Sequence, residues 1–257
     1  MALKIEDYAI IGDCKTAALV GRDGSIDWLC WPRFDSAACF AALLGTPENG
    51  RWLIAPKHPV RGVSRHYRPG TLVLETEFQT ETGSATIVDF MPPGDGTNLV
   101  RIAIGQSGRV EFRIDFVVRF NYGATVPWVS RLDGGTIDAI AGPERLVLRT
   151  SVALYGEDLK TVGEFAVDAG ESVPFVLSYG PSFRSPPPAT DAFDALAVFH
   201  QRGGRRCAEF RGPVGATKKL RDRRACRARS SSRMQNALTR AIHDRIPLVL
   251  DKADIWP

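Results

Sequence analysis

The sequence predicts a mainly β protein: an antiparallel two-sheet β-sandwich, followed by a linker and a disordered basic tail. Three observations lead to this prediction. Segments in which apolar and polar residues alternate with period two recur through residues 1–182. Clusters of Gly, Pro and Asp separate these segments, with almost no helical periodicity between them. After residue 199 the alternation stops and the charge balance reverses. About ten strands without intervening helices favour a sandwich over a βαβ fold.

The clearest strand is Arg109–Phe120, in which apolar side chains occupy every even position and most odd positions are charged. Alternation over this length predicts one buried face and one solvated face. A hairpin is predicted where Thr16–Val20 and Ile26–Trp31 flank Arg22-Asp23-Gly24-Ser25. Asp-Gly is a strong signal for a two-residue turn, because both central residues of the favoured turn take positive φ.

A single helix is predicted within the sandwich, over Ser36–Leu44, because a short apolar segment there ends at Gly45. The other alternating or apolar segments are predicted to be strands that complete the sandwich. The further strands are predicted over Arg51–Ala55, Thr71–Thr80, Ala85–Met91, Leu99–Ile104, Thr136–Ile140, Arg145–Leu154, Gly163–Val167 and Val173–Tyr179.

The chain then divides into three parts. Residues 1–182 are the predicted sandwich domain, and residues 183–199 are a Pro-rich extended linker with the start of a helix. Thr190 or Asp191 is the expected N-cap of that helix. Residues 200–257 form an Arg-rich tail with too few large apolar residues to offset the entropy of ordering, so disorder is predicted there.

Charge is distributed unevenly along the chain. Residues 1–199 carry 18 Lys/Arg and 24 Asp/Glu, a balance of −6, whereas residues 200–257 carry 15 and 5, a balance of +10. The tail is therefore expected to bind polyanions through charge alone, with an affinity that falls steeply with salt. It has no interleaved aromatic residues and no recognisable nucleic-acid fold, so no specific nucleic-acid partner is expected.

Composition narrows the class of protein. The chain has 257 residues, of which 44% are hydrophobic and 24% charged, as in an ordinary globular protein. No apolar run reaches the roughly 18–20 residues of a membrane span, so no membrane partner is expected. The N-terminus lacks the apolar segment of a signal peptide, and the expected location is cytoplasmic. The five cysteines and four histidines show no close ligand pairs, so reduced thiols and no metal site are predicted.

A family resemblance is carried by several short motifs. The run Ile5–Gly45 contains IGD, TAALV, DGSIDWLC and WPRFDS, and GRWLIAP at Gly50–Pro56 and VDFMP at Val88–Pro92 follow. Together they resemble bacterial glycoside hydrolase family 15, the glucoamylase and trehalase-like enzymes, over residues 1–199. The resemblance implies a supersandwich-like N-terminal domain joined by a linker to a catalytic double ring of α-helices. It also implies inverting hydrolysis of an α-glucosidic oligosaccharide or trehalose, with no cofactor.

The resemblance implies that catalysis belongs to a part of the family that this sequence does not match. The family's acid and base are two glutamates of the helical domain, and inversion needs carboxyl groups roughly 6.5–9.5 Å apart. The resemblance stops at Phe199 or His200, so no catalytic residue is assigned and the chain is expected to be a truncated member, inactive alone. One hypothesis is a reading-frame shift near codon 199 or 200, since a GC-rich gene read out of frame yields mostly Arg, Ala, Gly, Pro and Ser. The alternative is a genuine basic tail.

One cluster of aromatic and charged residues is the candidate site for binding sugar or contacting another domain. A structural interpretation competes with it, in which the aromatic side chains fill the core and Arg33 pairs with Asp35 at the rim. A carbohydrate-binding or interaction module built on the sandwich is the corresponding alternative function. The cluster consists of Trp28, Trp31, Arg33, Phe34 and Asp35.

Acidic residues give no independent sign of a catalytic pair. Asp23 lies in a predicted turn, where it has a sufficient structural role. No spacing indicates that any two of the acids face one another. The acids considered are Asp23, Asp27, Asp35 and Asp89.

Overall fold

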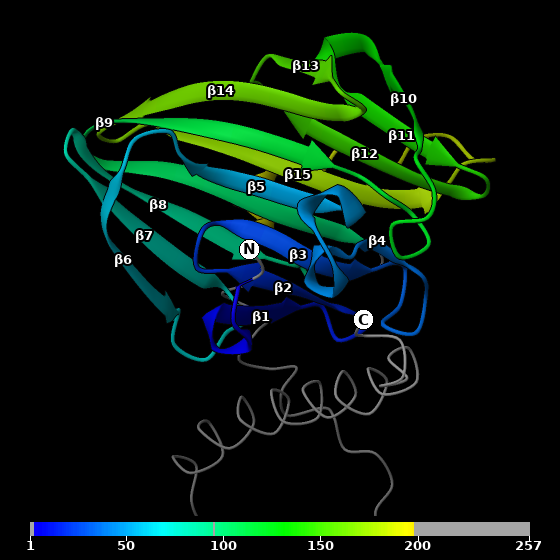
Figure 1. The fold of residues 1–257 in the computed structure, drawn as a ribbon, viewed down its shortest axis with the longest axis horizontal. Helices are drawn as coiled ribbons and strands as arrows, with labels where there is room; N and C mark the ends of the chain where they lie inside the picture. The colour runs from blue at the N-terminus through cyan, green and yellow to red at the C-terminus, as the bar shows by residue number, and fades with distance from the viewer. Residues whose placement is uncertain (1–2, 95, 198–257) are drawn as a thin grey trace, which may run out of the picture. The chain divides into compact units, whose positions relative to one another are not determined.

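The computed structural model describes residues 3–94 and 96–197, and within them it confirms the mainly β antiparallel fold, with fifteen strands (Figure 1). Two sheets are joined by one long strand, β9 (Asn98–Val117), that belongs to both. The first sheet also holds β1 (Tyr8–Gly12), β2 (Ala17–Gly21), β3 (Ser25–Cys30), β4 (Ala38–Phe40), β5 (Arg51–Pro56), β13 (Leu154–Glu157) and β14 (Lys160–Asp168). The second holds β6 (Val60–Tyr67), β7 (Leu74–Thr80), β8 (Gly83–Phe90), β10 (Trp128–Arg131), β11 (Ile137–Ala141), β12 (Glu144–Thr150) and β15 (Ser172–Pro181).

Strand order follows from the pairing of β9. Its first half pairs with β8 and β15, which gives the second sheet the order β6-β7-β8-β9-β15-β12-β11-β10. Its second half pairs with β5 and β14, which gives the first sheet the order β1-β2-β3-β5-β9-β14-β13. Strand β4 adds to the end of β3. The sequence predicts two separate strands here, Leu99–Ile104 and Arg109–Phe120. In the structure they belong to the two halves of the single strand β9.

Glycines allow β9 to pass from one sheet to the other. A Cβ at Gly105 would lie 2.1 Å from the carbonyl oxygen of Asp168, and one at Gly108 would lie 2.1 Å from that of Thr82. Gly108 also takes a φ of 59°, in the left-handed region that favours glycine. The neighbouring turns therefore approach the β9 backbone where it changes sheets, and only residues without a side chain fit.

The core lies between the two sheets, and the alternation in β9 explains how it forms. From residue 109 to 116 the even-numbered apolar side chains are buried and the odd-numbered polar ones face outward, as the sequence predicts. Residues 99–103 are buried on both faces, because a second apolar cluster covers the outer side of this half. In that cluster Val100 and Ile102 pack with Val88, and with Ala192 and Leu196 of a short helix.

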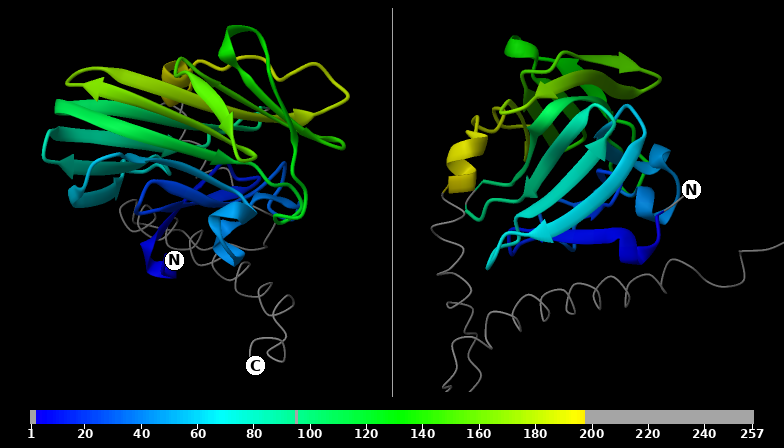
Figure 2. Two further views of the ribbon diagram at one scale, coloured as in Figure 1. Left: turned by 45° about the horizontal axis from the view of Figure 1, so that its top comes forward. Right: turned by 90° about the vertical axis from the view of Figure 1, so that its left-hand side faces the viewer.

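The helix spanning residues 192–197 begins where the sequence predicts. The Asp191 carboxylate accepts hydrogen bonds from the backbone N–H groups of Phe193 (2.9 Å) and Asp194 (2.8 Å), which is N-cap geometry. Figure 2 shows the helix, in gold, on the outside of the second sheet. The segment before it is held along β12, because Arg145 donates to the carbonyl oxygen of Arg184 and Arg149 to that of Pro187.

A fully buried ion pair connects the two sheets. Arg101 of β9 is 0% exposed and its Nε lies 2.7 Å from Oδ1 of Asp89 on β8. The same guanidinium donates to the carbonyl oxygens of Trp52 (3.0 Å) and Gly24 (2.8 Å), both in the first sheet or its turns. It also lies 5.2 Å from the centre of the Trp52 ring, within the range of a cation–π interaction. One side chain thus satisfies acceptors from both sheets.

The predicted helix over Ser36–Leu44 is wrong. That segment forms strand β4 followed by a single 3-10 turn, Ala42–Leu44. Residues 38–42 are buried, so both faces of the segment are covered by protein. An apolar run that is buried on all sides has no periodicity that could distinguish a strand from a helix.

The hairpin between β2 and β3 is present, but its turn differs from the expected one. Only Gly24 takes a positive φ, at 87°, and Asp23 does not. A Cβ at Gly24 would lie 2.2 Å from the carbonyl oxygen of Ile54, so close packing against β5 requires glycine here. Asp23 instead accepts hydrogen bonds from the backbone N–H and hydroxyl of Ser25.

Four strands have no counterpart among the predictions, and a fifth, β13, is predicted only at its first residue. The predicted strand Arg145–Leu154 contains β12 and the first residue of β13. Most of the unpredicted strands are short or lie at an edge, where a solvated face leaves little alternation. They are β1, β4, β6 and β10.

Replacing Arg101 by Met should strongly destabilise the sandwich, because the Asp89 carboxylate would remain buried without its partner. We expect the free energy of unfolding to fall by about 3–5 kcal/mol in urea denaturation at pH 7. The control is Arg33→Met, which breaks the exposed pair with Asp35 and should cost no more than about 1 kcal/mol. Equal losses of unfolding free energy in the two variants would contradict the role of Arg101 in connecting the two sheets.

Candidate functional site

The predicted cluster of aromatic and charged residues does not form one site. Trp28 is half-buried on the outside of β3, where it packs against a small cluster of Cys30 and Ala38 and lies 6.1 Å from the ring of Tyr122. Trp31 is only 3% exposed and belongs to the main core between the sheets. The two indole rings therefore belong to different apolar clusters, and no single sugar ring could stack on both.

The other three members of the cluster lie on an exposed loop. Arg33 Nε and Asp35 Oδ1 are 3.1 Å apart, so the ion pair expected under the structural interpretation is present. Phe34 is 52% exposed, and its backbone N–H donates to the carbonyl oxygen of Lys15. Of the five predicted residues, Trp31 is the one that lines the pocket described below.

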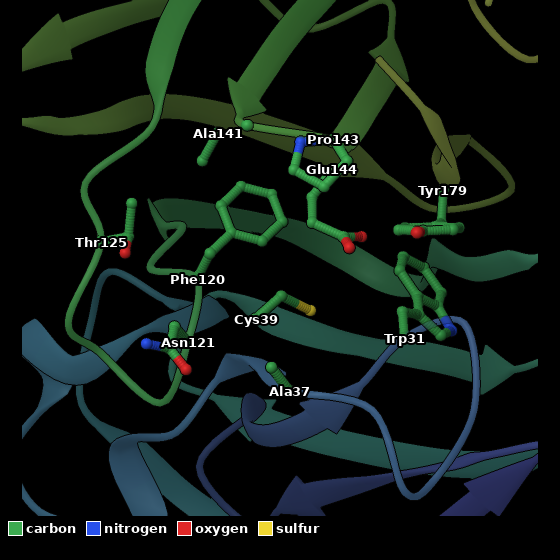
Figure 3. A pocket seen from close by; sticks show the side chains of 11 residues that line it. Trp31, Ala37, Cys39, Phe120, Asn121, Thr125, Ala141, Pro143, Glu144 and Tyr179 are labelled. Carbon is green, nitrogen blue, oxygen red and sulfur yellow. The ribbon is translucent and has the colours of Figure 1, made fainter. Parts of the chain in front are cut away.

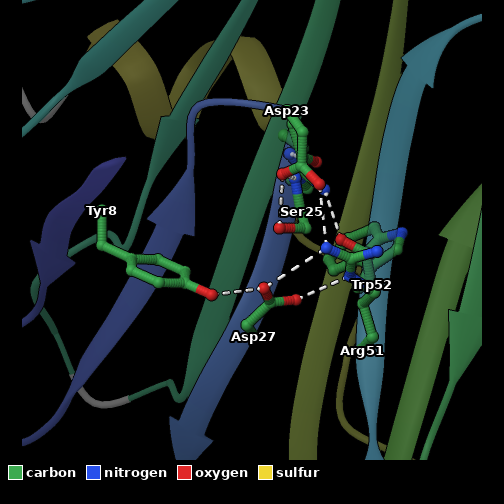
Figure 4. A network of polar contacts seen from close by, with 8 residues as sticks. Tyr8, Asp23, Ser25, Asp27, Arg51 and Trp52 are labelled. Carbon is green, nitrogen blue, oxygen red and sulfur yellow. Dashed lines mark hydrogen bonds and ion pairs between the residues drawn. The ribbon is translucent and has the colours of Figure 1, made fainter. Parts of the chain in front are cut away.

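The acidic residues are bound to arginines. Figure 4 shows the network in which Arg51 bridges Asp27 (2.7 Å) and Asp23 (2.8 Å). Tyr8 donates its hydroxyl to Asp27 at 2.7 Å. Burial raises the pKa of the Tyr8 phenol, and the hydrogen bond to Asp27 raises it further, so the phenol stays a donor at neutral pH.

The remaining two acids of the predicted set are likewise occupied. Asp35 pairs with Arg33, and Asp89 pairs with Arg101 in the core. A general acid or base must reach a substrate proton, and none of these carboxylates is both accessible and unpaired. The four acidic residues considered for acid–base chemistry in the sequence analysis therefore have structural roles.

A pocket of about 370 Å³ opens where the two sheets meet the loop after β9 (Figure 3). The segment between β3 and β4 supplies one side, the turn between β11 and β12 and the strand β15 supply the other, and the loop over residues 120–125 closes the end. Its lining residues are Trp31, Ala37, Cys39, Phe120, Asn121, Thr125, Ala141, Gly142, Pro143, Glu144 and Tyr179.

Glu144 and Tyr179 form the polar wall of this pocket. Burial raises the pKa of the Tyr179 phenol, and the neighbouring Glu144 carboxylate raises it further. The rings of Trp31 and Tyr179 have centroids 6.3 Å apart and are tilted by 52°. The Trp31 indole nitrogen has no hydrogen-bond partner within the described part of the chain, and it lies on the side of the ring away from Glu144 (Figure 3).

Sequence reasoning identifies Trp31 but misses the residues that surround it. Glu144, Tyr179 and Asn121 come from three separate segments, and none belongs to a motif. The pairing of β12 with β15, which places Leu146 opposite Tyr179, brings Glu144 and Tyr179 together, and the loop after β9 adds Asn121. No local spacing could have indicated this pocket.

The described residues contain no group of three His, Cys, Asp or Glu side chains placed to hold a metal ion. Within the same residues, no helix has both the length and the apolar character needed to cross a membrane.

Comparison with known proteins identifies one matching family model. The model is described as "Trehalase-like, N-terminal" and matches residues 1–171. These residues include β1 to β14 and stop just before β15. The match therefore covers both sheets, the Asp89–Arg101 pair and most of the pocket lining.

Curated relatives are similar to the same part of the chain. A trehalase of Mycolicibacterium smegmatis is 39% identical over 90 residues, which are 35% of this chain and 13% of that protein. A trehalase of Thermoplasma volcanium is 33% identical over 142 residues, 52% of this chain and 23% of the relative. Trehalase 1 of Sulfolobus acidocaldarius is 38% identical over 135 residues, with the same two coverages. The chain thus matches less than a quarter of the length of each of these relatives.

Cys39 at the base of the pocket should resist alkylation in the folded protein. Burial raises the pKa of its thiol, so little of the reactive thiolate forms at pH 8. We expect iodoacetamide to modify the exposed Cys14 but not Cys39, and to modify both in urea, as read by peptide mass spectrometry. Equal rates for the two thiols in the folded protein would contradict the burial of the Cys39 thiol.

Proposed function

Because the chain belongs to the trehalase-like N-terminal family, we propose that its sandwich is the noncatalytic N-terminal domain of an α-glucosidic hydrolase. The proposed parent enzyme is of the glucoamylase or trehalase type of glycoside hydrolase family 15. It hydrolyses trehalose or an α-glucosidic oligosaccharide with inversion. The names of the curated relatives support a trehalose-type substrate.

The pairing of the acidic residues is the observation that supports the noncatalytic role. Inverting hydrolysis needs a protonated acid and an unpaired carboxylate on opposite faces of the sugar. In this sandwich Asp23 and Asp27 both form ion pairs with Arg51, and Asp89 forms a buried ion pair with Arg101. Glu144 is half-buried in the pocket, and no second carboxylate lines that pocket.

An exposed apolar surface supports contact with another domain. It surrounds strand β10, the last strand of the second sheet, and Trp128 at its start is 80% exposed. Apolar surface that a folded domain leaves exposed commonly marks an interaction site. We propose that this β10 surface packs against the catalytic domain. It consists of Val126, Trp128, Val129 and Leu132.

Two other functions have different support. The pocket beside Trp31 favours a carbohydrate-binding role for the sandwich, which is developed below. Polyanion binding through the tail, and the reading-frame hypothesis, concern residues 200–257, which lie outside the described residues. The cytoplasmic location stays a prediction.

The purified chain should release no glucose from trehalose, maltose or isomaltose. The reason is that the four acids of the predicted set pair with arginines, and Glu144 is the single acid among the residues that line the pocket. Coupled detection of glucose against a heat-denatured blank measures this directly. Turnover that follows the protein through chromatography would contradict the noncatalytic role.

Trp128→Ser should affect domain contact and not the sandwich itself. Because Trp128 is 80% exposed, we expect the free energy of unfolding of this chain to change by no more than about 0.5 kcal/mol. In a chimera that joins residues 1–197 to the part of the Mycolicibacterium smegmatis trehalase that follows its matching segment, the same change should lower the melting temperature and the trehalose hydrolysis.

Phe183→Ser is the matched control, because Phe183 is 77% exposed and is not part of the β10 surface. Equal effects of the two substitutions in the chimera would contradict docking through β10. An effect of Trp128→Ser on the isolated chain as large as in the chimera would also contradict it.

A further inference from the structure

The pocket at the end of the sandwich has no role in the proposed docking function. It is lined by segments of both sheets, so its walls are set by the packing of the sandwich. At about 370 Å³ it falls in the lower part of the range of ligand sites, roughly 300–1,000 Å³. It therefore has room for a small ring compound and not for an extended chain.

The pocket is apolar at its base and polar at its opening. Trp31, Cys39 and Phe120 are each less than a tenth exposed and form the base. Asn121 and Thr125 stand at the exposed rim (Figure 3). This arrangement, in which a few polar groups converge over an aromatic base, is typical of sites for small ligands.

The polar groups favour a ligand with hydroxyl groups. Glu144 offers carboxylate oxygens as acceptors, whereas the Asn121 amide and the Thr125 hydroxyl can each donate and accept. Tyr179 lines the same part of the pocket as Glu144. No Lys, Arg or His lines the pocket, so an anionic ligand would meet the Glu144 charge without a compensating cation.

The backbone presents Asn121 to the pocket in a strained conformation. Asn121, Tyr122 and Gly123 have φ values of 51°, 58° and 97°, three successive residues in the left-handed region. The turn is closed by reciprocal hydrogen bonds between Phe120 and Thr125, of 2.8 and 3.0 Å. Non-glycine residues rarely adopt this region, and those that do cluster at ligand sites.

From this geometry we propose that the pocket binds one neutral sugar ring, with its apolar face on the aromatic base and its hydroxyl groups on Glu144, Asn121 and Thr125. An organic cation would use the aromatic rings and the carboxylate as well. It would leave the donors of Asn121 and Thr125 without acceptors, which is why the sugar is favoured. The site is noncatalytic, and the inference does not depend on the proposed role of the sandwich in an enzyme.

Calorimetric titration of the purified chain with glucose tests this site. Trehalose and choline chloride are titrated in parallel. We expect glucose to bind with a dissociation constant in the millimolar range. Glu144→Gln should weaken it about tenfold, because a hydrogen bond to a charged acceptor is lost. Asn121→Gly should weaken it several-fold without unfolding the protein, because glycine accepts the left-handed backbone at this position.

Each variant has a matched control outside the pocket. Glu157→Gln makes the same chemical change at an exposed site on β13, and Asp158→Gly replaces another residue of positive φ, 47°. Both controls should bind glucose as the original chain does. The inference is overturned if neither sugar binds, if choline binds and the sugars do not, or if the pocket variants and their controls bind equally. Because glucose is not a glycoside, these results are independent of any hydrolytic activity.

Discussion

The buried pair of Asp89 and Arg101 is the interaction on which the two-sheet arrangement depends. Desolvating a carboxylate and a guanidinium costs several kcal/mol for each ion, and only a well-formed pair with further hydrogen bonds offsets this cost. Here the guanidinium reaches Asp89 on the second sheet and the carbonyl oxygens of Gly24 and Trp52 on the first. These acceptors are in place only when both sheets are folded and correctly packed, so the pair selects this packing over other compact arrangements.

This interaction also gives a physical reason for the motifs that resemble glycoside hydrolase family 15. Gly24 belongs to DGSIDWLC, Trp52 to GRWLIAP and Asp89 to VDFMP, and all three converge on Arg101. Asp23 and Asp27 of the first motif are joined by Arg51 of the second. These three motifs therefore hold the two sheets together, and their acids support the fold.

Alternation predicted the fold well where one face of a strand meets water, as in residues 109–116 of β9. It failed for Ser36–Leu44, whose central residues are buried on all sides, and it could not detect that two predicted strands were continuous through Gly105 and Gly108. The candidate pocket was even less predictable. Trp31 stands out as an aromatic residue in a dense cluster, but Glu144 and Tyr179 meet it only through sheet pairing over more than a hundred residues.

The sharing of β9 between the sheets has a consequence for how the sandwich comes apart. In many sandwiches each strand belongs to one sheet only, and one sheet can unfold locally while the other stays folded. Here the same backbone supplies a central strand to both ladders, so separating either sheet removes hydrogen bonds from the strand that organises the other. Opening should therefore be all-or-none, with amide hydrogens in the two halves of β9 exchanging at the same, globally limited rate.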